Sequence, residues 1–445
     1  MADRAAPGTL RVWTGLLLIA LWALAIVDMA WPVPEVVAVV GIAAYVLLSL
    51  VRGSRQARWM CGALTAAIVA LSWSFGVAEA AFAGIGRALV FAAFMPTIVL
   101  IRATAEQRPE VAQARRLFTN LAPEHRAGGI LFGCHVLGSV ISLGVFGLLA
   151  PIVGTEGPPE HRTRIVCIAV RSMCVGALWS PFFVSVVLAS QFITTVPLWR
   201  VMAIGIPFAA LGLLISFFVL GDGAGGLAAL RRSLASLVPI VPPVAIAAAL
   251  VAAISGLGGL TTLQAIVIGI PPLCLAGLLP LGVSRLGEAV RATWRSLPDI
   301  GGEIGILVLA IALGVVFEAA LTAGGAVADV AGLELEPFAA IAIIIAGMSV
   351  AGLAGLHPII SATVVLVVAT GLPIGLADFV LMQSVLIGWA LGAMVSFSGV
   401  SVVTASALFD LSPWRLIFGR NIVFVIVFGS VSVLILGFLN RVFVG

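Results

Sequence analysis

The stretch Gly176-Ala-Leu-Trp-Ser-Pro-Phe-Phe-Val-Ser-Val-Val-Leu-Ala-Ser190 occurs a second time, as Gly392-Ala-Met-Val-Ser-Phe-Ser-Gly-Val-Ser-Val-Val-Thr-Ala-Ser406. The two copies align without a gap and share nine residues, including three serines and the opening Gly-Ala pair. An apolar composition produces chance Val and Ala matches, but it does not place serines in register. The duplication therefore predicts two homologous repeats, residues 1–225 and 226–445, as in many secondary transporters.

Two further matches occur in the same order in both halves. Gly133-Cys-His-Val-Leu-Gly-Ser139 aligns with Gly355-Leu-His-Pro-Ile-Ile-Ser361, and the triplet Glu79-Ala-Ala aligns with a triplet that begins at Glu318. The offsets between the halves are 239 residues for the glutamates, 222 for the histidines and 216 for the serine stretch. The shrinking offset places about 17 and about 6 additional residues in polar loops of the first half.

The composition is that of a polytopic membrane protein. Hydrophobic residues make up 62% of the chain, charged residues only 9%, and the mean hydropathy is +1.24, values outside the range of soluble domains. The net charge of +4 suits contact with anionic lipid, and we expect no nucleic-acid partner. All 23 basic residues are Arg, which indicates a GC-rich bacterial genome and hence the bacterial inner membrane.

Apolar runs separated by Arg, Pro and Gly-rich breaks predict an all-α fold of about 12 to 14 transmembrane segments. The repeats meet in the glycine-rich run at 221–226. Seven segments per half, an odd number, would insert the second repeat in the opposite orientation. The predicted segments are 12–29, 36–51, 59–75, 88–101, 128–151, 165–195 and 201–220, then 238–255, 262–283, 303–321, 337–350, 353–371, 379–408 and 416–440.

The repeated serine stretch lies in the middle of the long segments 165–195 and 379–408, which predicts a broken or re-entrant helix in each. Pro181 follows Ser180 in the first copy, and Ser396, Ser398 and Gly399 occupy the second; both compositions interrupt helices. Interrupted backbone at membrane depth offers helix ends and free carbonyls to a substrate or cation. Ser185 and Ser401 would add hydroxyl ligands. The alternative is that these small residues only allow close helix packing.

His135 and His357 occupy equivalent repeat positions, and each is followed four residues later by a serine, Ser139 or Ser361. On a helix this spacing places imidazole and hydroxyl on one face. The pair predicts proton coupling or substrate contact, because an ordinary histidine titrates near physiological pH. The alternative is a neutral imidazole that bonds a neighbouring carbonyl and fixes a helix contact.

Three charged residues lie close to apolar segments and are candidates for coupling. Glu79 and Glu318 each follow an apolar helix and precede a small-residue stretch. Each is interpreted as a proton or sodium ligand at a re-entrant tip, or as the cap of a following short helix. Arg171 precedes the first serine stretch, where it would balance a substrate carboxylate or extend to the membrane interface. Its counterpart is Ile387, so such a role would be asymmetric.

Other chemistries have little to build on. The five cysteines lie in apolar runs without ligand spacing, and no histidine pair has metal spacing. The chain has no Lys, so a phosphate-binding glycine loop with lysine is excluded. We therefore expect neither an enzyme, a bound metal nor a cofactor.

The paired halves, each with a carboxylate before a short stretch and a later helix broken at a serine motif, resemble the ion transporter superfamily. That group includes the large membrane subunits of tripartite periplasmic transporters and the divalent anion/sodium symporters. The Ser-Asn-Thr signature of the symporters is absent; the asparagines are Asn120, Asn421 and Asn440.

The resemblance implies a transporter of a small organic anion, coupled to sodium or protons. Its expected partners are the lipid bilayer, a second copy of the chain in a homodimer, and, in a tripartite system, a periplasmic binding protein. A membrane-embedded enzyme using the His, Ser and Glu groups is the alternative.

Overall fold

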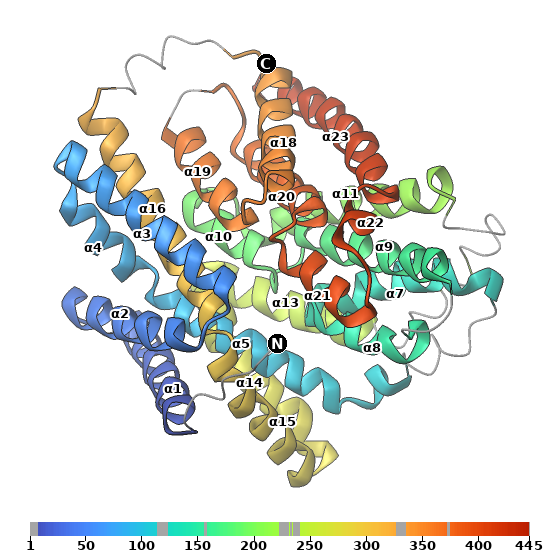
Figure 1. Ribbon diagram of the computed structural model, residues 1–445, viewed down its shortest axis with the longest axis horizontal. Helices are drawn as coiled ribbons and strands as arrows, with labels where there is room; N and C mark the ends of the chain where they lie inside the picture. Colours follow the sequence, from blue (N-terminus) through green and yellow to red (C-terminus); the bar gives the residue numbers. More distant parts are fainter. Residues whose placement is uncertain are drawn as a thin grey trace. The chain divides into compact units, whose positions relative to one another are not determined.

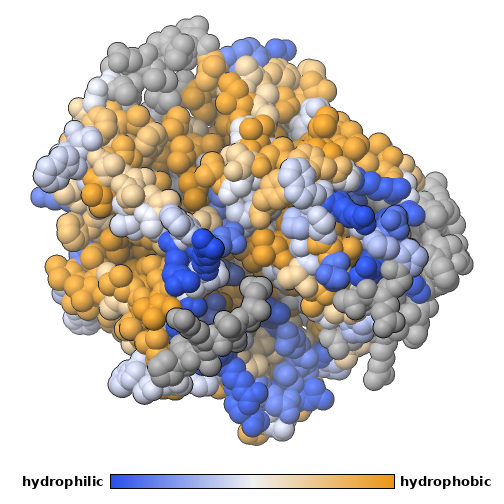
Figure 2. Space-filling model, in the orientation of Figure 1, coloured by the Kyte–Doolittle hydropathy of each residue, from blue (hydrophilic) through white to orange (hydrophobic). Residues whose placement is uncertain are grey.

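The computed structural model describes residues 8–113, 123–154, 158–221, 231, 234, 241–325, 335–371 and 374–444. Over these residues the regular secondary structure is helical, without a strand. Nine of the described helical segments are long and apolar enough to cross a membrane, and five shorter apolar helices accompany them. Apolar residues cover most of the face shown in Figure 2. The chain is an all-α polytopic membrane protein.

The chain divides into two compact units, and each takes segments from both predicted repeats. The first unit comprises Met1–Gln107 and Leu263–Leu333, and the second comprises Arg108–Thr262 and Glu334–Gly445. The repeat boundary predicted within 221–226 lies largely outside the described residues, so the repeats themselves stay a prediction.

In the first unit, a helix from the second predicted repeat packs against helices from the start of the chain. A core of Ile68, Ala312 and Val316 joins α3, α4 and α16, which lie side by side in Figure 1. The helices of this unit are α1 (Gly8–Ala30), α2 (Glu35–Arg52), α3 (Arg55–Phe75), α4 (Ala78–Arg87), α5 (Leu89–Gln107), α14 (Thr262–Leu278), η3 (Leu279–Leu281), α15 (Val283–Ser296), η4 (Leu297–Asp299) and α16 (Gly301–Ala323).

The second unit contains both serine stretches and both histidines. Its helices come from two separate parts of the sequence and include long buried runs: in α9 every residue from Ile165 to Val175 is buried. They are α7 (Pro123–Ile141), α8 (Gly144–Val153), α9 (Pro159–Val175), η1 (Gly176–Leu178), α10 (Val184–Phe192), α11 (Leu198–Leu214), η2 (Ile215–Val219), α13 (Val241–Gly258), α18 (Pro337–Leu353), α19 (Pro358–Gly371), α20 (Asp378–Val395), α21 (Val400–Phe409), α22 (Pro413–Ile417) and α23 (Arg420–Val444).

Every predicted segment overlaps a described helix, but the segment 128–151 is divided into α7 and α8 at Ser142, and the prediction missed two elements in the first unit. The short helix α4 follows α3 after Gly76, whose left-handed backbone (φ 68°) ends α3. The helix α15 is amphipathic: Arg285, Arg291 and Arg295 are exposed, while Ala289 and Thr293 are buried. Both are too polar or too short to register as apolar runs.

Candidate functional site at two broken helices

The first serine stretch interrupts the helix between α9 and α10. After the single turn of η1 the chain leaves helical geometry at Trp179 and resumes it at Val184. The hydroxyl of Ser180 donates to the backbone carbonyl of Ser139 and accepts the amide N–H of Phe182 at 3.3 Å. Ser185 donates to the carbonyl of Ala177 at 3.1 Å. The predicted break is present, and serine hydroxyls bond the backbone groups on either side of it.

The second serine stretch interrupts the helix between α20 and α21. Ser396 and Gly399 have extended backbone conformations, and α21 begins at Val400. The Ser396 hydroxyl donates to the carbonyl of Leu356 at 3.2 Å and accepts the amide N–H of Ser398 at 3.3 Å. Ser401 donates to the carbonyl of Ala393 at 2.9 Å.

The two breaks therefore repeat the same hydrogen bonds at positions 216 residues apart. The first serine of each stretch accepts an amide two residues on, and the second donates to the carbonyl eight residues back. Ser139 and Ser361 also match, since each donates to the carbonyl three residues back. One bond differs: Ser180 reaches Ser139, whereas Ser396 reaches Leu356, which aligns with Cys134 and not with Ser139.

The two broken helices exchange contacts reciprocally. The half-helix α10 packs on α19 and α20, while α21 packs on α8 and α9. By the sequence offsets, α20 corresponds to α9, and α19 corresponds to residues 136–149 at the end of α7 and the start of α8. A reciprocal pattern of this kind is what a two-fold relation between the copies produces.

Charged residues at the start of each broken helix extend the reciprocity. Arg162 in α9 donates to the carbonyl of Phe409 at the end of α21, at 3.0 Å. Asp378 in α20 lies 216 residues further along and accepts the hydroxyl of Thr195, just after α10. Each broken helix is thus joined at its start to the end of the other, once through a cation and once through an anion.

Side-chain contacts also link the helices that carry the two breaks. The thiol of Cys174, at the end of α9, lies close to the hydroxyl of Ser401. The side-chain amide of Gln383, in α20, donates to the carbonyl of Leu178 in η1 at 3.4 Å. Neither Cys174 nor Gln383 was predicted as a site residue. Gln383 could have been predicted from the sequence, because a side-chain amide inside the apolar segment 379–408 needs a hydrogen-bond partner.

Both histidines form hydrogen bonds that define a neutral imidazole. Nε2 of His135 accepts the indole N–H of Trp179 at 3.2 Å, and an indole only donates, so the ring proton lies on Nδ1. Nδ1 lies 3.0 Å from the carbonyl of Ser172, which it contacts from α7 across to α9. His357 differs: its Nδ1 accepts the amide N–H of Ile359 at 3.2 Å. Val395 stands at the position equivalent to Trp179, so the second half lacks the histidine–indole bond.

The other charged candidates lie apart from the breaks or in unexpected settings. Glu79 is exposed in the first turn of α4, whose N-cap is Val77, so Glu79 does not cap that helix. Glu318 is exposed inside α16, which continues to Ala323; its prediction as the cap of a following helix is wrong. Both glutamates belong to the first unit. Arg171 is completely buried in α9 with its guanidinium 5.5 Å from the ring centre of Phe424, so it does not extend to the membrane interface.

The serines at the breaks are themselves buried. Ser180 and Ser396 have no exposed surface, and Ser185 and Ser401 are 2% and 5% exposed. Pro181 is also buried, and Gly399 lies directly before the first residue of α21. In this conformation the hydroxyl protons bond backbone carbonyls, so a ligand role is left to the oxygen lone pairs. Over the described residues, no group of three or more His, Cys, Asp or Glu side chains is arranged to hold a metal.

Comparison with known proteins finds a likeness in structure but none in sequence. No family model matches the chain, and no curated protein matches it. The crystal structure of the YdaH transporter of Alcanivorax borkumensis, described as having an unusual topology, is similar at 12% sequence identity, with a TM-score of 0.45. The alignment covers 78% of this chain and 85% of that one. A likeness of this degree assigns no function, and membership of the ion transporter superfamily stays a prediction.

Proposed function

We propose that the chain is a secondary active transporter that moves a small organic anion by alternating access, along a path formed at the two broken helices. The observation that carries the proposal is the pair of interruptions at equivalent positions, joined by reciprocal contacts within one compact unit. Interrupted helices at membrane depth expose backbone dipoles that suit substrates and ions, and they persist where they are buried or line a path.

Electrostatics favour an anion as the cargo. Among the described residues, the buried side chains with a permanent charge are Arg162 and Arg171, and both belong to α9. Buried charge is costly in an apolar protein and usually serves a role. The N-terminal ends of the half-helices α10 and α21 add partial positive charge beside the breaks. A carboxylate is the complementary group, and a transported acid is therefore preferred to a transported cation.

We favour sodium as the coupling ion, with protons as the alternative. Proton uptake by His135 would place a proton on Nε2, where the indole of Trp179 already donates. Proton uptake by His357 at Nδ1 would cost the bond from Ile359. Backbone carbonyls and hydroxyl lone pairs at the breaks are ligands suited to a small cation. The bacterial inner membrane as location, a homodimer and a periplasmic binding protein partner belong to the same proposal.

The test is uptake of labelled acids into proteoliposomes under imposed sodium or proton gradients. We expect saturable uptake of a carboxylate that accumulates above equilibrium only with an inward sodium gradient. Flux that never exceeds equilibrium would indicate a passive channel. Uptake only after a periplasmic binding protein is added would indicate the tripartite system. A chemically altered product in detergent solution, without vesicles, would indicate an enzyme.

A further inference from the structure

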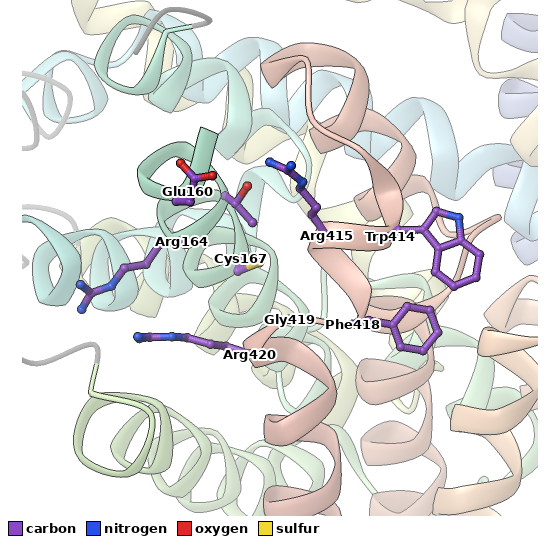
Figure 3. A pocket seen from close by; sticks show the side chains of 9 residues that line it. Glu160, Arg164, Cys167, Trp414, Arg415, Phe418, Gly419 and Arg420 are labelled. Carbon is purple, nitrogen blue, oxygen red and sulfur yellow. The ribbon is translucent and has the colours of Figure 1, made fainter. Parts of the chain in front are cut away.

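A pocket of about 740 Å³ lies in the second unit, and none of the serines of the two breaks lines it. Its walls come from the first turns of α9 and from α22 with the start of α23. Figure 3 shows Arg415 and Arg420 extending toward the α9 side of the pocket, and the rings of Trp414 and Phe418 pointing the opposite way. The pocket therefore has one basic wall and one aromatic wall.

The basic wall is built around guanidinium groups. Arg164 donates to the carbonyl of Gly221 and Arg420 to the carbonyl of the preceding Leu220, both at 2.8 Å. A guanidinium has five N–H donors, so the anchoring bond of Arg164 leaves it other donors. Arg415 is exposed, and its side chain forms no hydrogen bond or ion pair with any residue that the structure describes. Glu160 is the acidic lining residue, so three positive charges face one negative charge.

Two buried polar atoms of lining residues point to a ligand independently of charge. Nε of Arg164 and the hydroxyl oxygen of Thr163 are inaccessible to solvent, and neither has a hydrogen-bond partner among the described residues. Buried polar atoms nearly always have a partner, and exceptions mark a missing water, ion or ligand. The Arg164 guanidinium with its buried Nε, the Thr163 hydroxyl and the two other lining arginines fit an acceptor with several oxygens.

We propose that this pocket binds an oxyanion, a carboxylate or phosphate group, held by Arg164, Arg415 and Thr163. Arginine forks match the geometry of both groups through paired N–H···O bonds. The chemistry is shared by a dissolved acid and by the headgroup of an anionic lipid. Anion binding in this pocket does not depend on the proposed transport function. A further role of the pocket as the entry site of the transported acid does rest on that proposed function.

The aromatic wall connects this pocket to the second break. Trp414 and Phe418 are stacked with their ring centres 4.9 Å apart, and the ring of Phe397 lies 4.8 Å from that of Trp414. Phe397 stands between Ser396 and Ser398, inside the interruption. An anion in the pocket would therefore lie one aromatic layer from the break.

The experiment measures binding, without flux, to the full-length protein. In neutral detergent, calorimetric titrations with inorganic phosphate and with citrate test the dissolved source. In nanodiscs, native mass spectrometry of retained phosphatidylglycerol, against phosphatidylcholine, tests the lipid source. For whichever probe the wild-type protein binds, we expect Arg415→Gln to weaken binding about tenfold or more, because the variant loses charged hydrogen bonds to the anion. Arg415→Lys should give an intermediate loss, and Thr163→Val a smaller one.

The matched control is Arg200→Gln, which removes the same charge from the second unit outside the pocket. Arg200 lies over the ring of Trp199, 5.6 Å from its centre. Equal binding by the Arg415→Gln and Arg200→Gln variants overturns the proposal, and so does a wild-type protein that binds none of the probes. Because no transport is measured, a failed site and a failed transport assignment give different results.

Discussion

The first and the second break share their serine hydrogen bonds but differ in what else holds them. The first is held from outside the serine motif: His135 accepts from Trp179, and Gln383 donates to Leu178. At the second, the side-chain hydrogen bond beyond the shared pattern is local, since the hydroxyls of Ser396 and Ser398 lie 3.1 Å apart, and the ring of Phe397 adds packing against Trp414. A break held by separate helices is rigid, whereas a break held by adjacent small residues rearranges at lower cost. We infer that the second break is the more adaptable of the two.

The largest expected effect comes from the helix that covers the first break. A methyl group on Gly205 of α11 would overlap the carbonyl of Leu178. Overpacking against backbone is poorly relieved, so Gly205→Ala should lower the free energy of unfolding by about 3 kcal/mol. Thermal unfolding in detergent measures it. At the second break, Gly352→Ala should cost less, because its methyl would lie 2.6 Å from the carbonyl oxygen of Gly392.

The control for these glycines is Gly147→Ala in α8, where an added methyl meets nothing within 4 Å. That variant should unfold at the wild-type temperature or slightly above. A Gly205→Ala protein as stable as the Gly147→Ala protein would show that α11 does not press on the first break.

The two charged contacts between the broken helices, Arg162 with Phe409 and Asp378 with Thr195, should contribute differently to stability. Arg162→Gln removes a charged donor that is 8% exposed, and should cost about 2 kcal/mol of unfolding free energy. Asp378→Asn keeps an acceptor oxygen at an exposed position and should cost less than about 1 kcal/mol. Chemical denaturation of both variants, with Arg200→Gln as the control for charge, makes the comparison. Equal losses of unfolding free energy in the two variants would mean that burial does not make the Arg162 contact stronger than the Asp378 contact.

The serines provide a smaller and more specific test. Ser180→Ala leaves the carbonyl of Ser139 without its donor and should cost about 1 kcal/mol of unfolding free energy. Ser396→Ala should cost about half as much, because the neighbouring Ser398 hydroxyl can replace part of the lost bonding. The double variant Ser396→Ala/Ser398→Ala should then match Ser180→Ala. If the single Ser396→Ala variant is already as unstable as Ser180→Ala, the second break is not the more adaptable one.

The smallest expected effect is on proton coupling. With sodium as the coupling ion, His135→Gln and His357→Gln should leave the response of uptake to an imposed pH gradient unchanged. Trp179→Phe should instead lower stability by about 1 kcal/mol, since Nε2 of His135 loses its donor. Trp199→Phe, at a residue 57% exposed, is the control. Loss of substrate-driven proton movement in either histidine variant, at fixed sodium, would restore the proton role.

The duplicated stretch was the part of the site most open to prediction. Serine, proline and glycine within a long apolar segment interrupt a helix for local reasons, so residues 176–190 and 392–406 predicted both breaks from the chain alone. The apolar runs likewise predicted the spanning segments, because lipid demands helices of a minimum length. The amphipathic helix α15 was not predicted, because its buried face becomes recognisable only in the structure, where Ala289 and Thr293 pack.

The sequence by itself determined a polytopic helical membrane protein with two matched interruptions, because hydropathy and helix breaking act over a few neighbouring residues. Only the tertiary structure decided what those interruptions contact. The bond from Trp179 to His135 joins residues 44 apart, and that from Arg162 to Phe409 joins residues 247 apart. The burial of Arg171 and the exposure of Glu318 also depend on how distant helices pack. A residue's type sets what it can bond, whereas its partner depends on long-range packing that no local pattern records.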